Sequence, residues 1–231
     1  MLLFSLECSA AAASAAIYRD EKLLGEEFLN VPQTHSVTLL PMAKSLLEHT
    51  GISPAQIDYY AVSRGPGSFT GLRIGIAAIK GLAFPDNTPC IGVSTPEAIS
   101  YGLLGFEGTV IPMMDARCGQ VYTALFQGKD GRLTRLSEDE ALPLSELKEK
   151  LKSCTGPLWL CGDGAHLGLA AWGEELPVRM APAHLCCQRA SAVGLAAVQH
   201  LGEAVSPAAL VPCYLRPANA MTLAERQKKA E

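Results

Sequence analysis

Two successive runs of the same secondary-structure order constrain the fold of this 231-residue chain more than any other feature. In the first half, apolar spacing predicts the order βββαβαβ, at residues 2–6, 13–19, 23–29, 36–50, 59–63, 70–84 and 90–93. The second half predicts the same order and one more helix, at residues 109–114, 120–126, 132–136, 144–154, 158–161, 165–172, 178–181 and 190–201. Three strands joined by turns, followed by strands alternating with helices, predict a mixed sheet with helices on its faces.

Two copies of this unit in tandem predict an α/β fold of two similar lobes. Such a fold is similar to the duplicated ribonuclease-H-like lobes of the actin-like ATPase superfamily. We expect an N-terminal lobe with partner-binding helices at residues 1–104, a C-terminal lobe at 105–216 and a charged tail at 217–231. Because one fold supports many activities, the function has to come from particular residues.

Composition excludes several classes of protein. The chain is 48% hydrophobic and 18% charged, which excludes a wholly disordered protein. Its formal net charge is −4, so a broadly basic surface for nucleic acid is excluded and only a local basic patch stays open.

The cysteines and the first residues predict a cytoplasmic protein. Eight cysteines are scattered along the chain without a CxxC motif, so we expect reduced thiols and no zinc ribbon. No Lys or Arg precedes the first apolar run and Glu7 interrupts it, which is unlike an export signal. No stretch reaches the roughly 18 apolar residues of a membrane span.

The sharpest local pattern is the glycine-rich segment GPGSFTGLRIG at residues 65–75, between a predicted strand and a predicted helix. Free N–H groups at such a helix start can bind a phosphate or a carboxylate. The candidate residues are Gly65, Gly67, Ser68, Thr70 and Gly71. The segment is not a P-loop, because no Gly-Lys-Ser/Thr follows. The alternative is a tight turn whose glycines allow close packing of the helix.

The helix predicted at residues 70–84 is apolar on two sides. Leu72, Ile76 and Ile79 share one face, which we expect to pack on the sheet. Ile74 and Ala78 lie on the other side, together with small residues that allow close approach. That second side predicts either a helix central to one domain or a surface that contacts another chain.

The same segment, together with matches along nearly the whole chain, resembles the TsaB (YeaZ) family. The matching residues are GPGSFTGLRIG, His35-Ser36 with Leu39-Leu40-Pro41, Gly92-Val93-Ser94-Thr95, Asp115-Ala116-Arg117 with Val121-Tyr122, and Pro212 with Tyr214-Leu215-Arg216. The resemblance implies a non-catalytic subunit of the machinery that makes threonylcarbamoyladenosine beside the anticodon of tRNAs reading codons that begin with A. It also implies a heterodimer with the catalytic paralogue TsaD, and TsaE in a ternary complex.

The family pairs through its first long helices, so the resemblance predicts where partners bind. The expected interface residues are Leu39, Met42, Leu46, Arg73, Ile74, Ala78 and Gly81. We expect a homodimer in isolation, because one self-complementary patch is enough for a two-fold contact. The homodimer should give way to a heterodimer when TsaD is added, and tRNA should be met through the complex.

Several residues argue against chemistry by the chain itself. Glu7 stands where the family usually has Asp, and the longer side chain disfavours metal–nucleotide binding. No HExxH motif occurs, and the position four after His35 is Leu39, so no metal-binding histidine pair forms. Cys118 has no neighbouring His in the sequence and is expected to be a turn residue. We expect no catalytic residue, no metal and no cofactor.

Two other functions stay open from the residues alone. The first is an active ATP-dependent enzyme of the same fold, such as a small-molecule kinase, in which Glu7 and Asp115 would hold the metal. Arg117 disfavours it, because a phosphate-binding hairpin needs glycine there. The second is a regulatory module that binds an anion at the Gly65–Gly71 loop.

Overall fold

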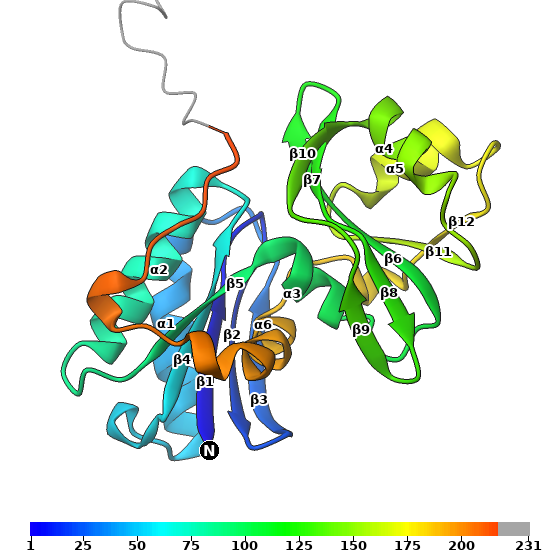
Figure 1. The fold of residues 1–231 in the computed structure, drawn as a ribbon. Helices are drawn as coiled ribbons and strands as arrows, with labels where there is room; N and C mark the ends of the chain where they lie inside the picture. Colours follow the sequence, from blue (N-terminus) through cyan, green and yellow to red (C-terminus); the bar gives the residue numbers. More distant parts are fainter. Residues whose placement is uncertain (217–231) are drawn as a thin grey trace, which may run out of the picture.

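The computed structural model describes residues 1–216, which form two lobes (Figure 1). The sheet of the first lobe has the strand order β3-β2-β1-β4-β5. Its strands are β1 (Leu2–Glu7), β2 (Ala13–Arg19), β3 (Lys22–Leu29), β4 (Tyr59–Gly65) and β5 (Cys90–Ser94). The first three strands pair antiparallel, whereas β4 and β5 continue from β1 in parallel.

Helices cover both faces of this sheet, because its strands are buried on both sides. Phe4 and Leu6 pack with α1 (His35–Thr50) and α2 (Phe69–Ala83) on one face. Leu3, which precedes Phe4, packs with α6 (Ala190–Ala197) on the other face, as period-two alternation requires. The short helix α3 (Thr95–Tyr101) lies beside α6.

The sheet of the second lobe repeats this arrangement, with the order β10-β7-β6-β11-β12. Its strands are β6 (Gly108–Arg117), β7 (Gln120–Thr123), β8 (Phe126–Lys129), β9 (Arg132–Arg135), β10 (Glu140–Pro143), β11 (Leu158–Cys161) and β12 (Val178–Met180). Its helices are α4 (Leu144–Leu151) and α5 (Ala165–Trp172), and short 3₁₀ turns occur at Pro54–Gln56, Ala183–Leu185, Val198–Glu203 and Pro207–Ala209. The predicted α/β fold of two ribonuclease-H-like lobes is therefore confirmed.

The second lobe differs from the predicted order in its strands. The single strand predicted at 120–126 is two strands, because β7 pairs with the end of β6 whereas β8 pairs with its beginning. Strand β10 was not predicted, and it takes the place beside β7 that the third strand of the first lobe has beside β2. Helix α3 was also missed, although Ser94 caps it and Pro96 stands in its first turn.

The predicted domain boundaries need a correction at the C-terminal end. Helix α6 returns to the first lobe, where Ser5 Oγ donates a hydrogen bond to the Ala190 carbonyl at 2.7 Å. The Ala190 N–H in turn donates to Ser14 Oγ at 2.7 Å. The first lobe thus comprises residues 1–104 together with the segment from α6 to residue 216, and the tail predicted at 217–231 lies outside the described residues.

Side chains from both lobes meet at the junction between them. Arg135, at the end of β9, bonds Asp139 at 2.8 Å and Glu97 of α3 at 3.3 Å. Ser94, at the end of β5, donates to Asp139 at 2.9 Å. These half-buried, charge-assisted contacts fix the orientation of the lobes and so the shape of the cleft between them.

Candidate functional site

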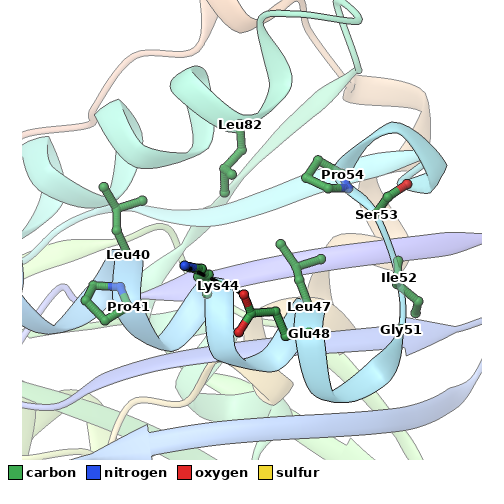
Figure 2. A pocket seen from close by; sticks show the side chains of 11 residues that line it. Leu40, Pro41, Lys44, Leu47, Glu48, Gly51, Ile52, Ser53, Pro54 and Leu82 are labelled. Atoms are coloured by element: carbon green, nitrogen blue, oxygen red, sulfur yellow. Dashed lines mark ion pairs between the residues drawn. The ribbon is translucent and has the colours of Figure 1, made fainter.

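An apolar groove runs along the outer surfaces of α1 and α2, which lie side by side on one face of the first sheet. Figure 2 shows Leu40 and Leu47 of α1 and Leu82 of α2 pointing toward one another across its wider part. This part has a volume of about 960 Å³. Leu40 and Leu82 also line a second hollow of about 440 Å³, so the two hollows adjoin. We refer to them together as the α1–α2 groove.

The rim of this groove combines exposed apolar side chains with one pair of charges. Leu40 is 52% exposed in the groove, and Val37, one turn before it on α1 and outside the groove lining, is 64% exposed. Lys44 and Glu48 form an i,i+4 ion pair of 3.7 Å beside the groove. A contiguous apolar surface with a polar rim is typical of a protein–protein contact site.

The structure corrects the α1 residues that were expected to contact a partner. Leu39, Met42 and Leu46 are at most 4% exposed and pack in the core between α1 and the sheet, although Leu39 also borders the second hollow. Side chains so deeply buried are not accessible to a partner in this structure. The accessible side of α1 is formed instead by Leu40, Pro41 and, one turn further on, Lys44.

The α2 residues of the predicted interface divide into two groups. Ile74 is half-buried, Ala78 is buried and Gly81 is exposed, and all three line the groove. Arg73 does not line it, because its guanidinium lies over the Phe69 ring and its Nε donates to Tyr214 Oη. On the opposite side, Leu72, Ile76 and Ile79 are buried against the sheet as their spacing predicts.

The glycine-rich segment is explained by close packing. A Cβ on Gly71 would lie 2.1 Å from the Cys8 carbonyl oxygen, and one on Gly67 would lie 2.6 Å from that of Ser9. Gly65 has φ +121°, and a Cβ there would lie 2.1 Å from the Cys213 carbonyl oxygen. The glycines therefore let two backbone segments approach the start of α2, and they account for the spacing without a bound anion.

Two N–H groups of this segment already have partners within the chain. The Ser68 N–H donates to the Ser9 carbonyl at 2.7 Å, and the Gly71 N–H donates to Ser68 Oγ at 3.2 Å. Ser68 is thus the N-cap of α2, as the prediction of a capping Ser allowed. Thr70 is exposed on the first turn.

A second candidate is the interlobe cleft, a hollow of about 450 Å³. Ser9 and Gly67 line it from the first lobe, whereas Asp115, Arg117 and Asp163 line it from the second. The Ser9 hydroxyl is buried and has no hydrogen-bond partner among the described residues. Burial raises the pKa of Asp163, whose carboxylate accepts a hydrogen bond of 2.6 Å from Gln188 Nε2.

Glu7, the departure from the family pattern, is closed off beneath this cleft. Its side chain is fully buried, and its oxygens accept hydrogen bonds from the Ser9 N–H and the Ser63 hydroxyl. Burial raises the pKa of Glu7, although these hydrogen bonds oppose the shift. Both carboxylate oxygens are engaged inside the fold, and Glu7 does not line the cleft that Asp115 lines.

His35 connects the same region to α1. Its Nε2 donates to the Ala10 carbonyl at 2.7 Å, while its Nδ1 is buried without a partner among residues 1–216. The side chain therefore joins the start of α1 to the β1–β2 loop. Within the described part of the chain, no group of three or more His, Cys, Asp and Glu residues is placed to hold a metal ion.

The eight cysteines are separate free thiols in the structure. Cys8, Cys90 and Cys161 are buried, whereas Cys118 is exposed on the β6–β7 turn. Burial raises the pKa of the Cys90 thiol to about 11. No helix within residues 1–216 is both long enough and apolar enough to cross a membrane.

Comparison with known proteins places this fold among close relatives. The family model described as "TsaD: tRNA N6-adenosine threonylcarbamoyltransferase" matches residues 29–155. The tRNA threonylcarbamoyladenosine biosynthesis protein TsaB of Bacillus subtilis is 30% identical over 220 residues, which are 95% of this chain and 96% of that protein. The chain belongs to the TsaB (YeaZ) family.

Other members of the TsaB (YeaZ) family agree with this placement. The TsaB protein of Escherichia coli is 34% identical over 71% of this chain and 72% of its own length. The crystal structure of YeaZ from Pseudomonas aeruginosa is 27% identical, covers 93% of this chain and 99% of its own, and has a TM-score of 0.77. A second Pseudomonas aeruginosa structure, described by its similarity to the peptidase YeaZ, has a TM-score of 0.80 at 28% identity.

Sequence reasoning missed Leu40 as a member of the α1–α2 groove. Val37 and Leu40 lie on the accessible side of α1, beside the buried Leu39. The apolar positions of α1 extend around more than half of the helix, so spacing alone did not distinguish the sheet side from the outer side.

Proposed function

We propose that this chain is a non-catalytic scaffold subunit of the complex that adds a threonylcarbamoyl group to the adenosine next to the anticodon of tRNAs reading A-starting codons. In this proposal it binds and activates the catalytic subunit TsaD through the α1–α2 groove. TsaE joins the assembled pair, and the chain pairs with itself when TsaD is absent. Membership of the TsaB family supports the broader statement, a role in threonylcarbamoyladenosine biosynthesis.

The observation that carries the proposal is the α1–α2 groove. Its lining is apolar, and its rim holds exposed aliphatic side chains of α1. Burying such side chains contributes about 1.5–3 kcal/mol each, which favours a partner over water. Two copies related by a two-fold axis can bury this apolar patch against each other, which supports the proposed homodimer of the isolated chain.

The scaffold role is also supported by the residues at the interlobe cleft, which differ from those that a kinase would need. A kinase of this fold needs carboxylates that face a metal–phosphate complex. Here Glu7 is buried with both oxygens engaged, and Arg117 occupies the turn where a phosphate hairpin needs glycine. The Ser–His contact between Ser45 Oγ and His49 Nδ1, at 3.4 Å, is exposed on α1 outside the interlobe cleft, so it gives little support to the peptidase name of a relative.

The proposal is tested by leaving out one subunit at a time. The chain is purified with TsaD and TsaE of the same organism, and modification of an unmodified tRNA transcript is measured with and without each protein. We expect no product from the chain alone and a large loss of product when it is omitted. Product formed equally well without the chain, or by the chain alone, would contradict the scaffold role.

A pair of substitutions then tests the groove itself. Leu40→Glu places a carboxylate in the groove, whereas Leu136→Glu makes the same change on the second lobe at the same exposure of 52%. In the complex with TsaD, Leu40→Glu loses the burial of the leucine side chain and buries an unpaired charge. The two together cost several kcal/mol, so TsaD binding should weaken about 100-fold or more. Leu136→Glu should bind normally.

Size-exclusion chromatography measures the pairing of the isolated chain, and titration calorimetry measures its binding to TsaD. Both variants should keep the melting temperature of the isolated monomer, because both sites are accessible there. Equal TsaD binding by the two variants would mean that the partner surface lies elsewhere.

A further inference from the structure

A third hollow lies where three distant segments of the chain converge. It has a volume of about 220 Å³ and adjoins the interlobe cleft. Its walls are the start of α2 with the residues before it, the β6–β7 hairpin and the stretch Tyr214–Arg216; the first two contribute Pro66, Gly67, Phe69, Ala116, Arg117, Cys118 and Tyr122. These segments carry three of the motifs that resemble the TsaB family, although about 100 residues separate the last two along the chain. We refer to this site as the arginine–aromatic hollow.

One side of this hollow is an ordered aromatic platform. The rings of Phe69 and Tyr214 stack with centroids 4.8 Å apart and planes at 29°. The guanidinium carbon of Arg73 lies 3.9 Å from the Phe69 centroid, and Arg73 Nε donates to Tyr214 Oη at 3.0 Å. These contacts hold Tyr214 in place while 36% of it stays exposed.

The other side of the hollow carries two arginines. Arg216 Nη1 donates to the Ala116 carbonyl at 2.8 Å, which anchors one guanidinium beside Arg117. The Arg117 guanidinium has no hydrogen-bond or ion-pair partner within residues 1–216, and neither has the Tyr122 hydroxyl. Both groups are therefore available to a ligand.

Arg117 is held in this position by an unusual backbone. Its φ is +66°, and Cys118 and Gly119 follow with φ of +54° and +69°. Asp115 Oδ1 accepts the Arg117 N–H at 2.7 Å and fixes the turn. A left-handed conformation is unfavourable for arginine, and such residues occur preferentially at binding sites.

The charge of the hollow differs from that of the whole chain. Its lining includes two arginines and no acidic residue, although the formal net charge of the chain is −4. Guanidinium groups bind phosphate through paired N–H donors, and exposed aromatic rings stack on nucleobases. The two together are typical of sites for single-stranded nucleic acid.

We propose that the arginine–aromatic hollow binds one unpaired nucleotide of the tRNA substrate, with its base on Tyr214 and its phosphate between Arg117 and Arg216. This inference rests on the proposed function, which supplies the RNA. A strand is favoured over a free nucleoside triphosphate for two reasons. The hollow has the volume of about one nucleoside, and its lining holds no carboxylate for the metal that a triphosphate carries.

The test measures binding of an unmodified transcript of a tRNA that reads an A-starting codon. The full chain and its pair with TsaD are titrated by fluorescence anisotropy at several salt concentrations. Arg117→Ala and Arg216→Ala should each weaken binding about tenfold, the value of one charge-assisted hydrogen bond. Each should also lower the slope of log affinity against log salt by about 1.

Two further variants separate base stacking from general charge attraction. Tyr214→Leu should weaken binding about tenfold through lost stacking and leave the salt slope unchanged. Arg132→Ala is the matched control, since it removes one exposed arginine of the same lobe at the β8–β9 turn. It should bind the transcript as the unchanged chain does.

Each outcome is decisive. Equal loss in Arg117→Ala and Arg132→Ala would indicate unspecific charge attraction and overturn the proposal, as would the absence of any tRNA binding. Displacement of the tRNA by ATP at millimolar concentration would assign the hollow to a mononucleotide and also overturn it. TsaD binding by Arg117→Ala is measured in parallel. If that binding persists while tRNA binding is unaffected, only this inference fails and the scaffold proposal stands.

Discussion

The substitution Gly71→Ala tests whether the glycine-rich segment serves close packing. Gly71 lies in the first turn of α2, and the added Cβ would be 2.1 Å from the Cys8 carbonyl oxygen. Ordinary contacts of this kind begin above 3.0 Å, so the start of α2 or the β1–β2 loop has to move by about 1 Å. The obstructing atom belongs to the backbone, and no rotamer change can relieve the clash.

The size of the effect follows from two opposing contributions. Overpacking of this kind costs about 3 kcal/mol when backbone must shift. Replacing glycine by alanine in a helix recovers about 1 kcal/mol of backbone entropy. The net loss of about 2 kcal/mol should lower the melting temperature by about 4–8 °C in a chain of this size.

Gly81→Ala is the matched control on the same helix. A Cβ there meets no atom within 4 Å, so only the favourable contribution applies. Its melting temperature should rise by about 2–4 °C, the value of about 1 kcal/mol. Thermal unfolding followed by circular dichroism, and urea unfolding as a check on the free energy, measure both variants. An unchanged melting temperature of Gly71→Ala would refute the packing explanation and restore the anion-binding interpretation of the segment.

Two other predictions concern ionisable groups. Burial raises the pKa of Glu7, so the folded state binds a proton more tightly than the unfolded state. The contribution of this proton to the free energy of unfolding is full below the unfolded-state pKa and is lost as the pH rises through the folded-state pKa. In urea unfolding, the stability of Glu7→Gln relative to the unchanged chain should therefore increase as the pH is raised above 4.5, and a pH-independent difference would contradict this. The eight cysteines should all react with a thiol reagent under denaturing, non-reducing conditions, whereas a reproducible deficit of two or more would indicate a native disulfide.

The sequence alone determined the repeated order of elements and much of their local structure. The strands at Ala13–Arg19 and Leu158–Cys161 and the helix at Ala165–Trp172 have the predicted bounds. The sheet side of α2 was also predicted, because Leu72 and Ile79 recur at helical spacing and both are buried. Such features depend on neighbours within a few residues, which periodicity and capping describe directly.

The tertiary structure alone decided which surfaces meet. Leu39 and Leu40 are consecutive apolar residues about 100° apart around α1, and packing of the helix on the sheet buries the first and leaves the second exposed. The spacing of apolar residues also predicted a helix at α6, but it did not indicate on which of the two sheets this helix packs. The bonds of Ala190 with Ser5 and Ser14 bring it to the first lobe.

The arginine–aromatic hollow shows the same limit. Arg117 and Tyr214 were recognised as parts of separate motifs, yet their proximity depends on chain segments that meet only after both lobes have formed. Local patterns fix which residues share a face of an element. Burial and the joining of distant segments are decided by long-range packing, which no window of sequence contains.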